Sequence, residues 1–286
     1  MNNTSQKKPD WFKILINVSP LVVLIFWGLN WYWVGEHFGT AVGGQFGDRF
    51  GAATSLFGGL TVVLLLITIR LQRQEIDDGK VEFKQQNRTL IHQRFENTFF
   101  QLLKFHADNV ASIDVVGENE RLGRDCFRFF YDHEFKGFVT RKKRNLMITA
   151  NPNIDPRSIS DQNVEDGIAL TIQDMKVLYG LFYEEWQSDL AHYFKTIYRI
   201  VKFIDEANHF EGNEKQVHQQ KKFYTGILRS QFSTYEALLI VYNGLGDHGT
   251  KMKPLIEKYG LLKGVEKSKL FVNPHEINQY QPSAIQ

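Results

Sequence analysis

The sequence predicts an all-α protein, with an N-terminal two-helix transmembrane hairpin followed by a cytoplasmic helical bundle. Three observations predict this architecture. Two long uncharged stretches lie near the start of the chain, the apolar residues after them recur at helical spacing, and no segment shows the alternation of a half-buried strand. A chain of 286 residues can hold such an anchor and one domain of about 150 to 200 residues.

The clearest element covers residues 51–69, which carry no charge. At about 1.5 Å per residue, a helix of this length nearly matches a hydrocarbon core about 30 Å thick. Arg70 and Arg73 follow it directly. We therefore expect a transmembrane helix that ends at a membrane face.

A second uncharged stretch covers residues 14–34, after a polar N-terminal tail at 1–13. Trp11 lies at one end and a cluster from Trp27 to Trp33 at the other, where aromatic rings settle at membrane interfaces. The alternative is a cleaved signal peptide, because lysines precede the apolar run. No small-residue cleavage site directly follows that run, which favours a permanent anchor.

The charges beside the two stretches predict their orientation. Three lysines precede the first stretch and Arg70 and Arg73 follow the second, whereas Arg49 is the only Lys or Arg between them. The positive-inside rule then places both termini in the cytoplasm, with the lipid bilayer as a partner. The single cysteine, Cys126, excludes an intrachain disulfide and fits a reducing compartment.

Small residues recur every fourth position through the connection and the second helix. Such spacing forms a ridge on which another helix can approach closely. The helix-packing candidates are Gly47, Gly51, Ser55 and Gly59, either within the hairpin or between copies in a homo-oligomer. Before Gly51 the simpler interpretation is a flexible loop.

Residues 70–94 are expected to form a connecting helix, loosened near Asp78–Gly79. Ile76, Phe83 and Leu90 are spaced by seven, as in a coiled coil. Most intervening core positions are polar, so the pattern supports a coiled coil only weakly.

The cytoplasmic helical domain is expected at residues 95–265, followed by a flexible tail at 266–286. Its first core helix presents Phe95, Phe99 and His106 on one face. Residues 151–166 contain two prolines and many Asp, Asn and Ser residues, and predict a loop. The expected helices cover residues 95–110, 124–140, 168–203 as a pair, 217–245 and 253–259.

Five segments, in chain order, resemble the AbiC-type phage abortive infection proteins of bacteria. The resemblance extends from residue 44 to residue 262. It implies anti-phage defence, a location in the bacterial inner membrane, and a phage-derived trigger or a partner defence protein, but no particular reaction. The segments are GQFGDRFGAATSLFGGLTVVLLLITIRLQRQEI, FENTFFQLLKFH, LAHYFKTIYRIVKFID, ILRSQFSTYEALLIVYNGL and KPLIEKYGL.

Polar residues on two long predicted helices suggest a pocket inside the bundle. Such a pocket could bind a phosphate-bearing ligand or carry acid and base chemistry, with His192 and Glu236 as weak catalytic candidates. The alternative is that these residues are interhelical hydrogen bonds that fix the packing. The binding candidates are His192, Tyr198, Arg199, Arg229, Gln231 and Asn243.

One motif suggests a nuclease. Arg128 and His133 have the Arg, four residues, His spacing of helical ribonuclease domains, although with 9 histidines such a loose spacing arises about once by chance. The basic run 141–144 could contact RNA or the anionic inner leaflet, or form a solvated surface. Nucleic acid is therefore a weakly supported partner.

Other chemical signatures are missing from the sequence, which contains no P-loop, GxSxG, HExxH or cysteine pair. No metal and no cofactor are therefore expected. Two hypotheses remain. In the first and favoured one, the protein is a membrane effector whose helical domain senses infection. In the second, the domain is a membrane-tethered ribonuclease or nucleotide-binding enzyme.

Overall fold

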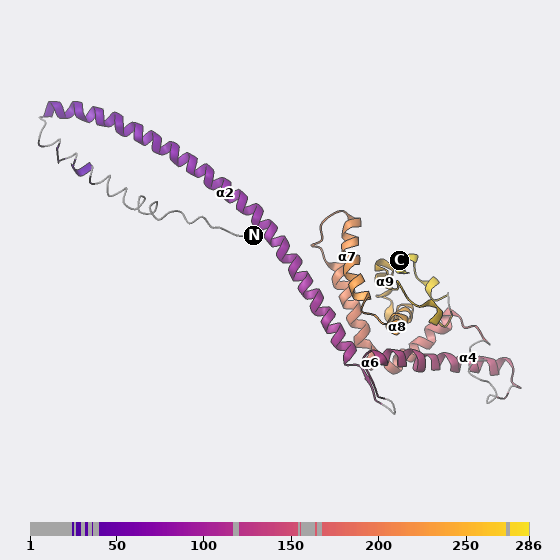
Figure 1. Cartoon of the computed structure of the whole chain (residues 1–286). Helices are drawn as coiled ribbons and strands as arrows, with labels where there is room; N and C mark the ends of the chain where they lie inside the picture. The colour runs from indigo at the N-terminus through magenta and orange to yellow at the C-terminus, as the bar shows by residue number, and fades with distance from the viewer. Residues whose placement is uncertain are drawn as a thin grey trace. The chain divides into compact units, whose positions relative to one another are not determined.

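The computed structural model describes residues 25, 27–29, 32–33, 36, 40–116, 120–153, 155, 164, 168–272 and 275–285. The expected polar tail at 1–13 lies outside these residues, as do most of the first expected membrane helix at 14–34 and most of the loop at 151–166. The chain divides into two compact units, residues 1–85 and residues 86–286. The described part is mostly helical, which confirms the predicted all-α class (Figure 1).

The longest element is α2 (Thr40–Ala111), an unbroken helix of 72 residues. The expected loosening near Asp78–Gly79 is wrong, and so is the flexible loop for residues 40–50. A glycine inside a helix costs only about 1 kcal/mol, and the neighbours of Gly79 include strong helix formers such as Lys80. The second membrane helix, the connecting helix and the first core helix are thus one element.

Between Leu56 and Leu71 the large apolar side chains of α2 are exposed. By length and composition α2 could cross a membrane, and none of its apolar window is buried inside the protein. No second helix of this kind occurs among the described residues, so a two-helix hairpin is not confirmed. A soluble protein would leave few such side chains uncovered.

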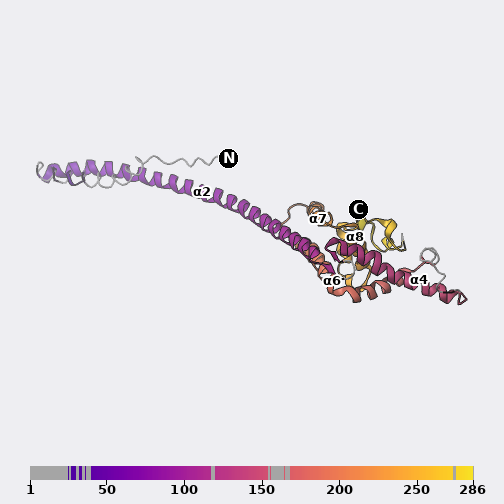
Figure 2. The ribbon, with the colours of Figure 1, turned by 60° about the horizontal axis from the view of Figure 1, so that its bottom comes forward.

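The second unit is a helical bundle in which α6 contacts α4, α7 and α8 (Figure 2). Its elements after α2 are α3 (Arg124–Phe129), the π-helix η1 (Phe130–Phe135), α4 (Lys136–Ala150), α6 (Ile172–Glu206), α7 (Glu214–Arg229), α8 (Thr234–Leu245), η3 (Asp247–Gly249), α9 (Lys253–Tyr259), η4 (Lys267–Lys269), η5 (Ile277–Gln279) and η6 (Pro282–Ile285). The expected short helix at 253–259 is confirmed.

One expected helix pair is confirmed and one expected single helix is divided. The pair expected at 168–203 corresponds to α6, which consists of two helices joined at a kink at Trp186, whose φ of −108° and ψ of 16° are not helical. The single helix expected at 217–245 is instead two helices. Ser233 is in an extended conformation and forms a capping box with Glu236, so a new helix, α8, begins there.

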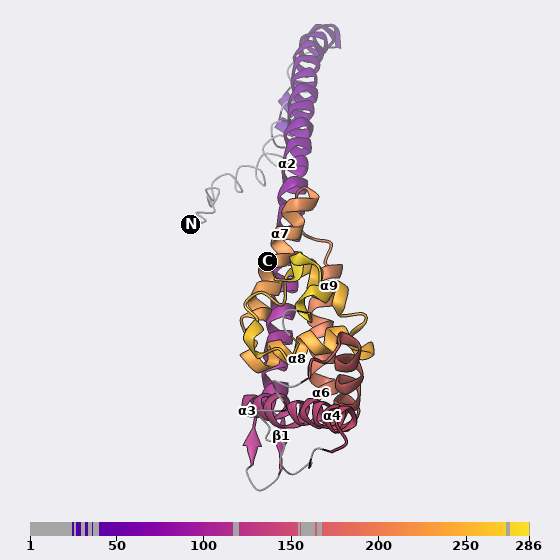
Figure 3. The same cartoon turned by 90° about the vertical axis from the view of Figure 1, so that its right-hand side faces the viewer.

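One small ladder contradicts the expectation of no strands. β1 (Asp114–Val115) pairs antiparallel with β2 (Arg121–Leu122), close to α3 (Figure 3). Gly123 follows with a φ of 60°, a left-handed conformation that favours glycine. The ladder therefore pairs the two ends of the connection between α2 and α3.

Aromatic rings dominate the core. Phe95 and Phe99 of α2 are buried as predicted, and Phe95 stacks on Phe203 of α6 at 5.0 Å between ring centroids. Phe135 of η1 is fully buried and contacts rings from α6, α8 and the C-terminal segment. These rings join elements that are far apart in the sequence.

The described C-terminal segment packs against this core, so the expectation of a flexible tail at 266–286 is wrong there. Leu270, Ile277 and Tyr280 are buried. The Tyr280 hydroxyl donates to the Val241 carbonyl at 2.6 Å, and it can approach closely because residue 244 is a glycine. Burial of these apolar side chains stabilises the packed segment.

Phe135→Ala should lower the free energy of unfolding by about 3 to 5 kcal/mol, because it removes a ring that packs against several elements at once. Chemical denaturation of the detergent-solubilised chain, followed by near-ultraviolet circular dichroism, measures the change. The control is Phe223→Ala, at a ring that is 64 % exposed and should matter by no more than about 0.5 kcal/mol. Equal effects of the two substitutions would contradict the assignment of this core.

Candidate functional site: a buried polar cluster

The predicted binding residues on α6 do not meet in a pocket. His192 and Arg199 are exposed. Tyr198 is half-buried, and the Lys202 ammonium lies 5.9 Å from its ring centroid. This face of α6 is therefore a polar surface with one cation–π contact.

The predicted residues on α7 and α8 make hydrogen bonds between elements. Arg229 donates from Nη1 to the Gly260 carbonyl at 3.0 Å, and Asn243 donates from Nδ2 to the Tyr179 hydroxyl at 3.2 Å. These contacts fit the alternative in which both residues fix the packing. Gln231 is exposed in the turn between α7 and α8.

The predicted nuclease pair is engaged in separate contacts. The Arg128 guanidinium lies 3.6 Å from the Asp132 carboxylate, and the exposed His133 stacks on Phe129 at 5.6 Å. No contact joins Arg128 to His133 in the described part of the chain. The structure thus offers no support for a phosphate held between them.

Glu236 is the one catalytic candidate that lies in a buried polar site. It is fully buried in the first turn of α8, where Oε2 accepts a hydrogen bond from the Ser233 backbone N–H at 2.7 Å. The same oxygen lies 3.9 Å from Nε of Arg124. The Arg124 Nη2 donates to the Gln231 carbonyl at 2.7 Å, which ties α3 to the turn before α8.

Tyr193 and His106 complete what we term the Glu236 cluster: His106, Arg124, Tyr193 and Glu236. The His106 and Tyr193 rings lie 5.5 Å apart, and each residue is no more than 2 % exposed. Within the described residues, neither ring nitrogen of His106 has a hydrogen-bond partner. The Tyr193 hydroxyl and Glu236 Oε1 make no hydrogen bond of good geometry there, although the Tyr193 hydroxyl interacts with the Glu236 carboxylate. Buried polar atoms without partners are rare and mark places where a ligand or ordered water can bind.

The electrostatics of the cluster favour neutral rings. Burial, and to a smaller extent the positive charge of Arg124, lowers the pKa of His106 to about 4. Burial, followed by the negative charge of Glu236, holds the pKa of Tyr193 well above its ordinary value. At neutral pH His106 therefore has one acceptor and one donor nitrogen, and Tyr193 keeps its proton.

A pocket of about 400 Å³ opens beside the cluster, lined by His106, Arg124 and Gln231 together with apolar residues of α2 and β2. An anionic group of a ligand could pair with the Arg124 guanidinium, which is about half exposed. A polar group farther in could donate to His106, which lines the pocket. The geometry suits binding of a small polar ligand.

Sequence analysis predicts Gln231 of this pocket and Glu236 of the adjoining cluster. It places His106 only on the core face of a helix, and it does not select Arg124 or Tyr193 as site residues. The sequence feature that could have revealed the cluster is His106, a histidine on an otherwise apolar helix face. Arg124 gave no signal because it lies 107 residues from the carbonyl that it contacts. Among the described residues, no group of three His, Cys, Asp or Glu side chains could hold a metal.

His106→Leu should weaken the dependence of stability on pH. The pKa of His106 is about 4 in the folded chain and about 6.5 in the unfolded chain, so the unfolded state binds more protons between these values. The free energy of unfolding is then highest above pH 6.5 and falls by about 3 kcal/mol toward pH 4.

Denaturation of the detergent-solubilised chain at pH 7, 6 and 5 measures this slope. His133→Leu, at an exposed histidine, is the control and should keep the wild-type slope. An unchanged slope in the His106 variant would show that His106 titrates normally.

Comparison with known proteins identifies one region. Residues 185–270 match the model of a family described as "Putative phage abortive infection protein". No curated protein and no solved structure matches the chain. The matched region contains Tyr193 and Glu236 of the cluster, together with α7, α8 and α9. Over residues 185–270 the chain is thus a match to the phage abortive infection family that its sequence resembles.

Proposed function

We propose that this chain is a membrane-anchored anti-phage defence protein that acts by abortive infection. The observation that carries the proposal is the family match at residues 185–270, which falls in the helical unit. The exposed apolar segment of α2 supports the anchor, because side chains such as Leu60 and Leu64 have no cover within the protein. Lipid would cover them without loss of backbone hydrogen bonds.

The proposed location is the bacterial inner membrane, with a two-helix hairpin and both termini in the cytoplasm. Support comes from the sequence. Arg70 and Arg73 follow the apolar segment of α2, while Arg49 is the only Lys or Arg in the expected outer connection. The helical unit that follows would then face the cytoplasm, where phage components appear during infection.

In the proposed mechanism, the helical unit senses a phage-derived trigger or a partner defence protein, and the anchors assemble into a homo-oligomer that damages the bilayer. The ridge of Gly47, Gly51, Ser55 and Gly59 supports this step. A Cβ atom added at Gly51 or Gly59 would meet nothing within 4 Å. A larger side chain there therefore meets nothing in the described part of the chain and would obstruct another helix, either the first membrane helix of the hairpin or one from a second copy.

The alternative is a membrane-tethered enzyme, either a ribonuclease or a nucleotide-binding enzyme. The structure supports ligand binding more than it supports a ribonuclease. Arg128 and His133 are occupied by Asp132 and Phe129, so the ribonuclease form rests on spacing alone. Ligand binding is favoured by the two buried ring nitrogens of His106, which lines the pocket and has no hydrogen-bond partner among the described residues. We therefore place ligand binding within the sensing role.

Gly51→Leu combined with Gly59→Leu should abolish phage restriction, because leucines on the ridge would keep another helix away. Plaque counts on cells that carry the variant measure restriction, and a potential-sensitive dye reports depolarisation after infection. Gly58→Leu is the matched control, since this glycine also has open space at its Cβ but lies off the ridge.

Wild-type restriction in the ridge variant, at equal protein level in the membrane, would contradict the assembly step. Restriction without any depolarisation in the wild type would instead move the effector role to the helical unit.

A further inference from the structure

The pocket beside the Glu236 cluster, which we call the His106 pocket, lies where the end of α2 meets β2 and the turn between α7 and α8. Two ionisable residues line it, Arg124 and His106. The Arg124 side chain is 54 % exposed, whereas His106 is only 2 % exposed. Arg124 therefore lies at the mouth of the pocket and His106 at its inner end.

The mouth of the His106 pocket favours a singly charged anion. Arg124 carries a permanent positive charge, and no Asp or Glu among the described residues lines the pocket. The Arg124 Nε atom lies 3.9 Å from the buried Glu236 carboxylate, and Nη2 donates to the Gln231 carbonyl at 2.7 Å. These contacts hold the guanidinium in place and leave Nη1 to donate to a ligand. Because Glu236 balances part of the charge, a carboxylate suits the mouth better than a phosphate does.

The inner end presents a buried hydrogen-bonding group. Neither ring nitrogen of His106 has a hydrogen-bond partner in the described part of the chain. The rings of Tyr193 and Phe232 lie beside it, at 5.5 and 6.1 Å between centroids. A neutral imidazole has one acceptor nitrogen, to which an N–H or O–H group of a ligand can donate. A buried polar group without a partner is costly, and a ligand that pairs with it recovers that cost.

The walls between the mouth and the inner end are apolar. They are formed by Ala107, Val110 and Ala111 of α2 and by Leu122 of β2. Leu122 is 62 % exposed, so a ligand that covered it would remove apolar surface from water. An apolar ligand body therefore fits between the two polar ends.

Backbone geometry holds the pocket in place. Gly123 has a φ of 60°, a left-handed conformation that favours glycine, and the residues on either side of it, Leu122 and Arg124, both line the pocket. The Gly123 N–H donates to the Ile113 carbonyl at 2.8 Å, and Leu122 pairs with Asp114 in the ladder. A site that is held in place before binding loses less entropy when a ligand binds.

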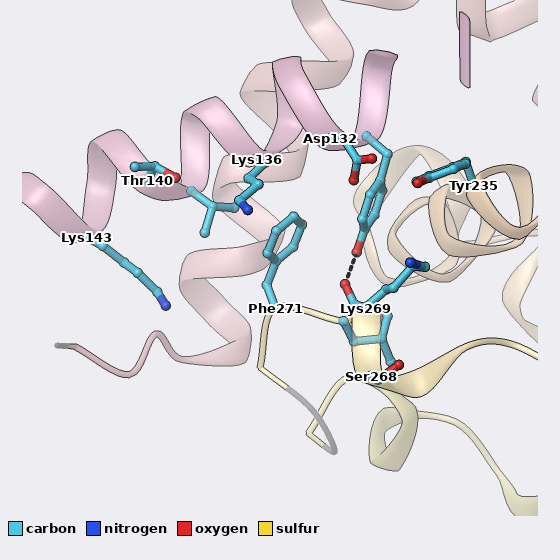
Figure 4. Close-up of a pocket in the computed structure, with 11 residues that line it drawn as sticks. Asp132, Lys136, Thr140, Lys143, Tyr235, Ser268, Lys269 and Phe271 are labelled. Atoms are coloured by element: carbon cyan, nitrogen blue, oxygen red, sulfur yellow. Dashed lines mark hydrogen bonds between the residues drawn. The ribbon is translucent and has the colours of Figure 1, made fainter. Parts of the chain in front are cut away.

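A second pocket, of about 330 Å³, lies between η1 and α4 on one side and residues 268–271 on the other (Figure 4). Several of its polar groups pair within the protein. The Tyr131 hydroxyl donates to the Lys269 carbonyl at 2.7 Å. The Ser268 hydroxyl and the Lys269 ammonium lie 3.5 and 3.6 Å from the Glu266 carboxylate. The ring nitrogens of His106 thus make the His106 pocket the better candidate for a ligand.

We propose that the His106 pocket binds a small carboxylate with an apolar body and an N–H or O–H donor. The carboxylate pairs with Arg124, the apolar body contacts Val110 and Leu122, and the donor binds His106. An N-acylated apolar amino acid and the last residue of a peptide share this chemistry. The inference rests on the proposed function and deepens it, because it gives the sensing unit a ligand class.

The test is isothermal titration calorimetry on the full chain in detergent micelles, with empty micelles as the blank. The two probes are N-acetyl-leucine and a glycine–serine peptide that ends in leucine with a free carboxylate. At least one of them should bind the wild type. The matching probe with an uncharged amide in place of the carboxylate should bind at least about tenfold more weakly, because it cannot form a charge-assisted hydrogen bond with Arg124.

Arg124→Gln should weaken binding of the carboxylate at least about tenfold and remove the preference for the carboxylate over the amide. A second variant, Leu122→Glu, keeps Arg124 and changes an exposed side chain, so it should fold. Its added carboxylate should repel the carboxylate of the probe and also weaken binding by about tenfold.

Arg128→Gln is the matched control, because Arg128 lies on the same helix but pairs with Asp132 at 3.6 Å and does not line the pocket. It should change the affinity by less than about twofold. Tighter binding of the peptide would identify a peptide end as the ligand, and tighter binding of N-acetyl-leucine would identify a free small molecule.

The inference is overturned if a folded wild type binds neither probe, if carboxylate and amide bind equally, or if Arg128→Gln weakens binding as much as Arg124→Gln does. A chain that restricts phage but binds neither probe would overturn this inference and leave the defence role intact. A chain that binds the carboxylate through Arg124 without restricting phage would support the inference and overturn the defence role.

Discussion

The uncovered apolar surface of α2 is the constraint on which the rest of the molecule depends. Exposing such side chains to water costs about 25 cal/mol for each Å² of apolar surface, whereas lipid covers them at no cost to the helical backbone. The same helix then supplies Phe95 and Phe99 to the core of the second unit. The exposed apolar segment and the first core residues of the bundle thus belong to the same helix, α2.

Within the bundle, α8 connects the Glu236 cluster to the C-terminal segment. Glu236 in its first turn is part of the cluster, and the Tyr242 hydroxyl near its end donates to Glu276 and accepts from the Phe271 backbone N–H. Glu236 and Glu276 are both fully buried, and each has one carboxylate oxygen that makes no hydrogen bond of good geometry among the described residues. Burying a carboxylate costs several kcal/mol unless it is well satisfied. Both carboxylates offset part of this cost by accepting hydrogen bonds from backbone N–H groups. These hydrogen bonds hold the first turn of α8 and the start of the C-terminal segment in place.

Residue patterns predict which segments of this chain are helical better than they predict where one helix ends and the next begins. The buried face of Phe95 and Phe99 and the short helix α9 follow from spacing alone. Gly79 does not break α2, because a single glycine between good helix formers costs too little to end a helix. The break before α8 is predictable only from the capping box that Ser233 forms with Glu236. The sites were harder. Tyr131 and Lys269, which are joined by a hydrogen bond, are 138 residues apart, and no local sequence pattern predicts such a contact.

Cysteine labelling tests the central claim most directly, namely that the apolar segment of α2 lies in a bilayer and the helical unit faces the cytoplasm. The native Cys126 is buried, so the background is low. A membrane-impermeant maleimide should label Lys84→Cys in inverted membrane vesicles but not in intact cells, and should label Leu60→Cys in neither. Equal labelling of Leu60→Cys and Lys84→Cys would place the apolar segment in water and contradict the account.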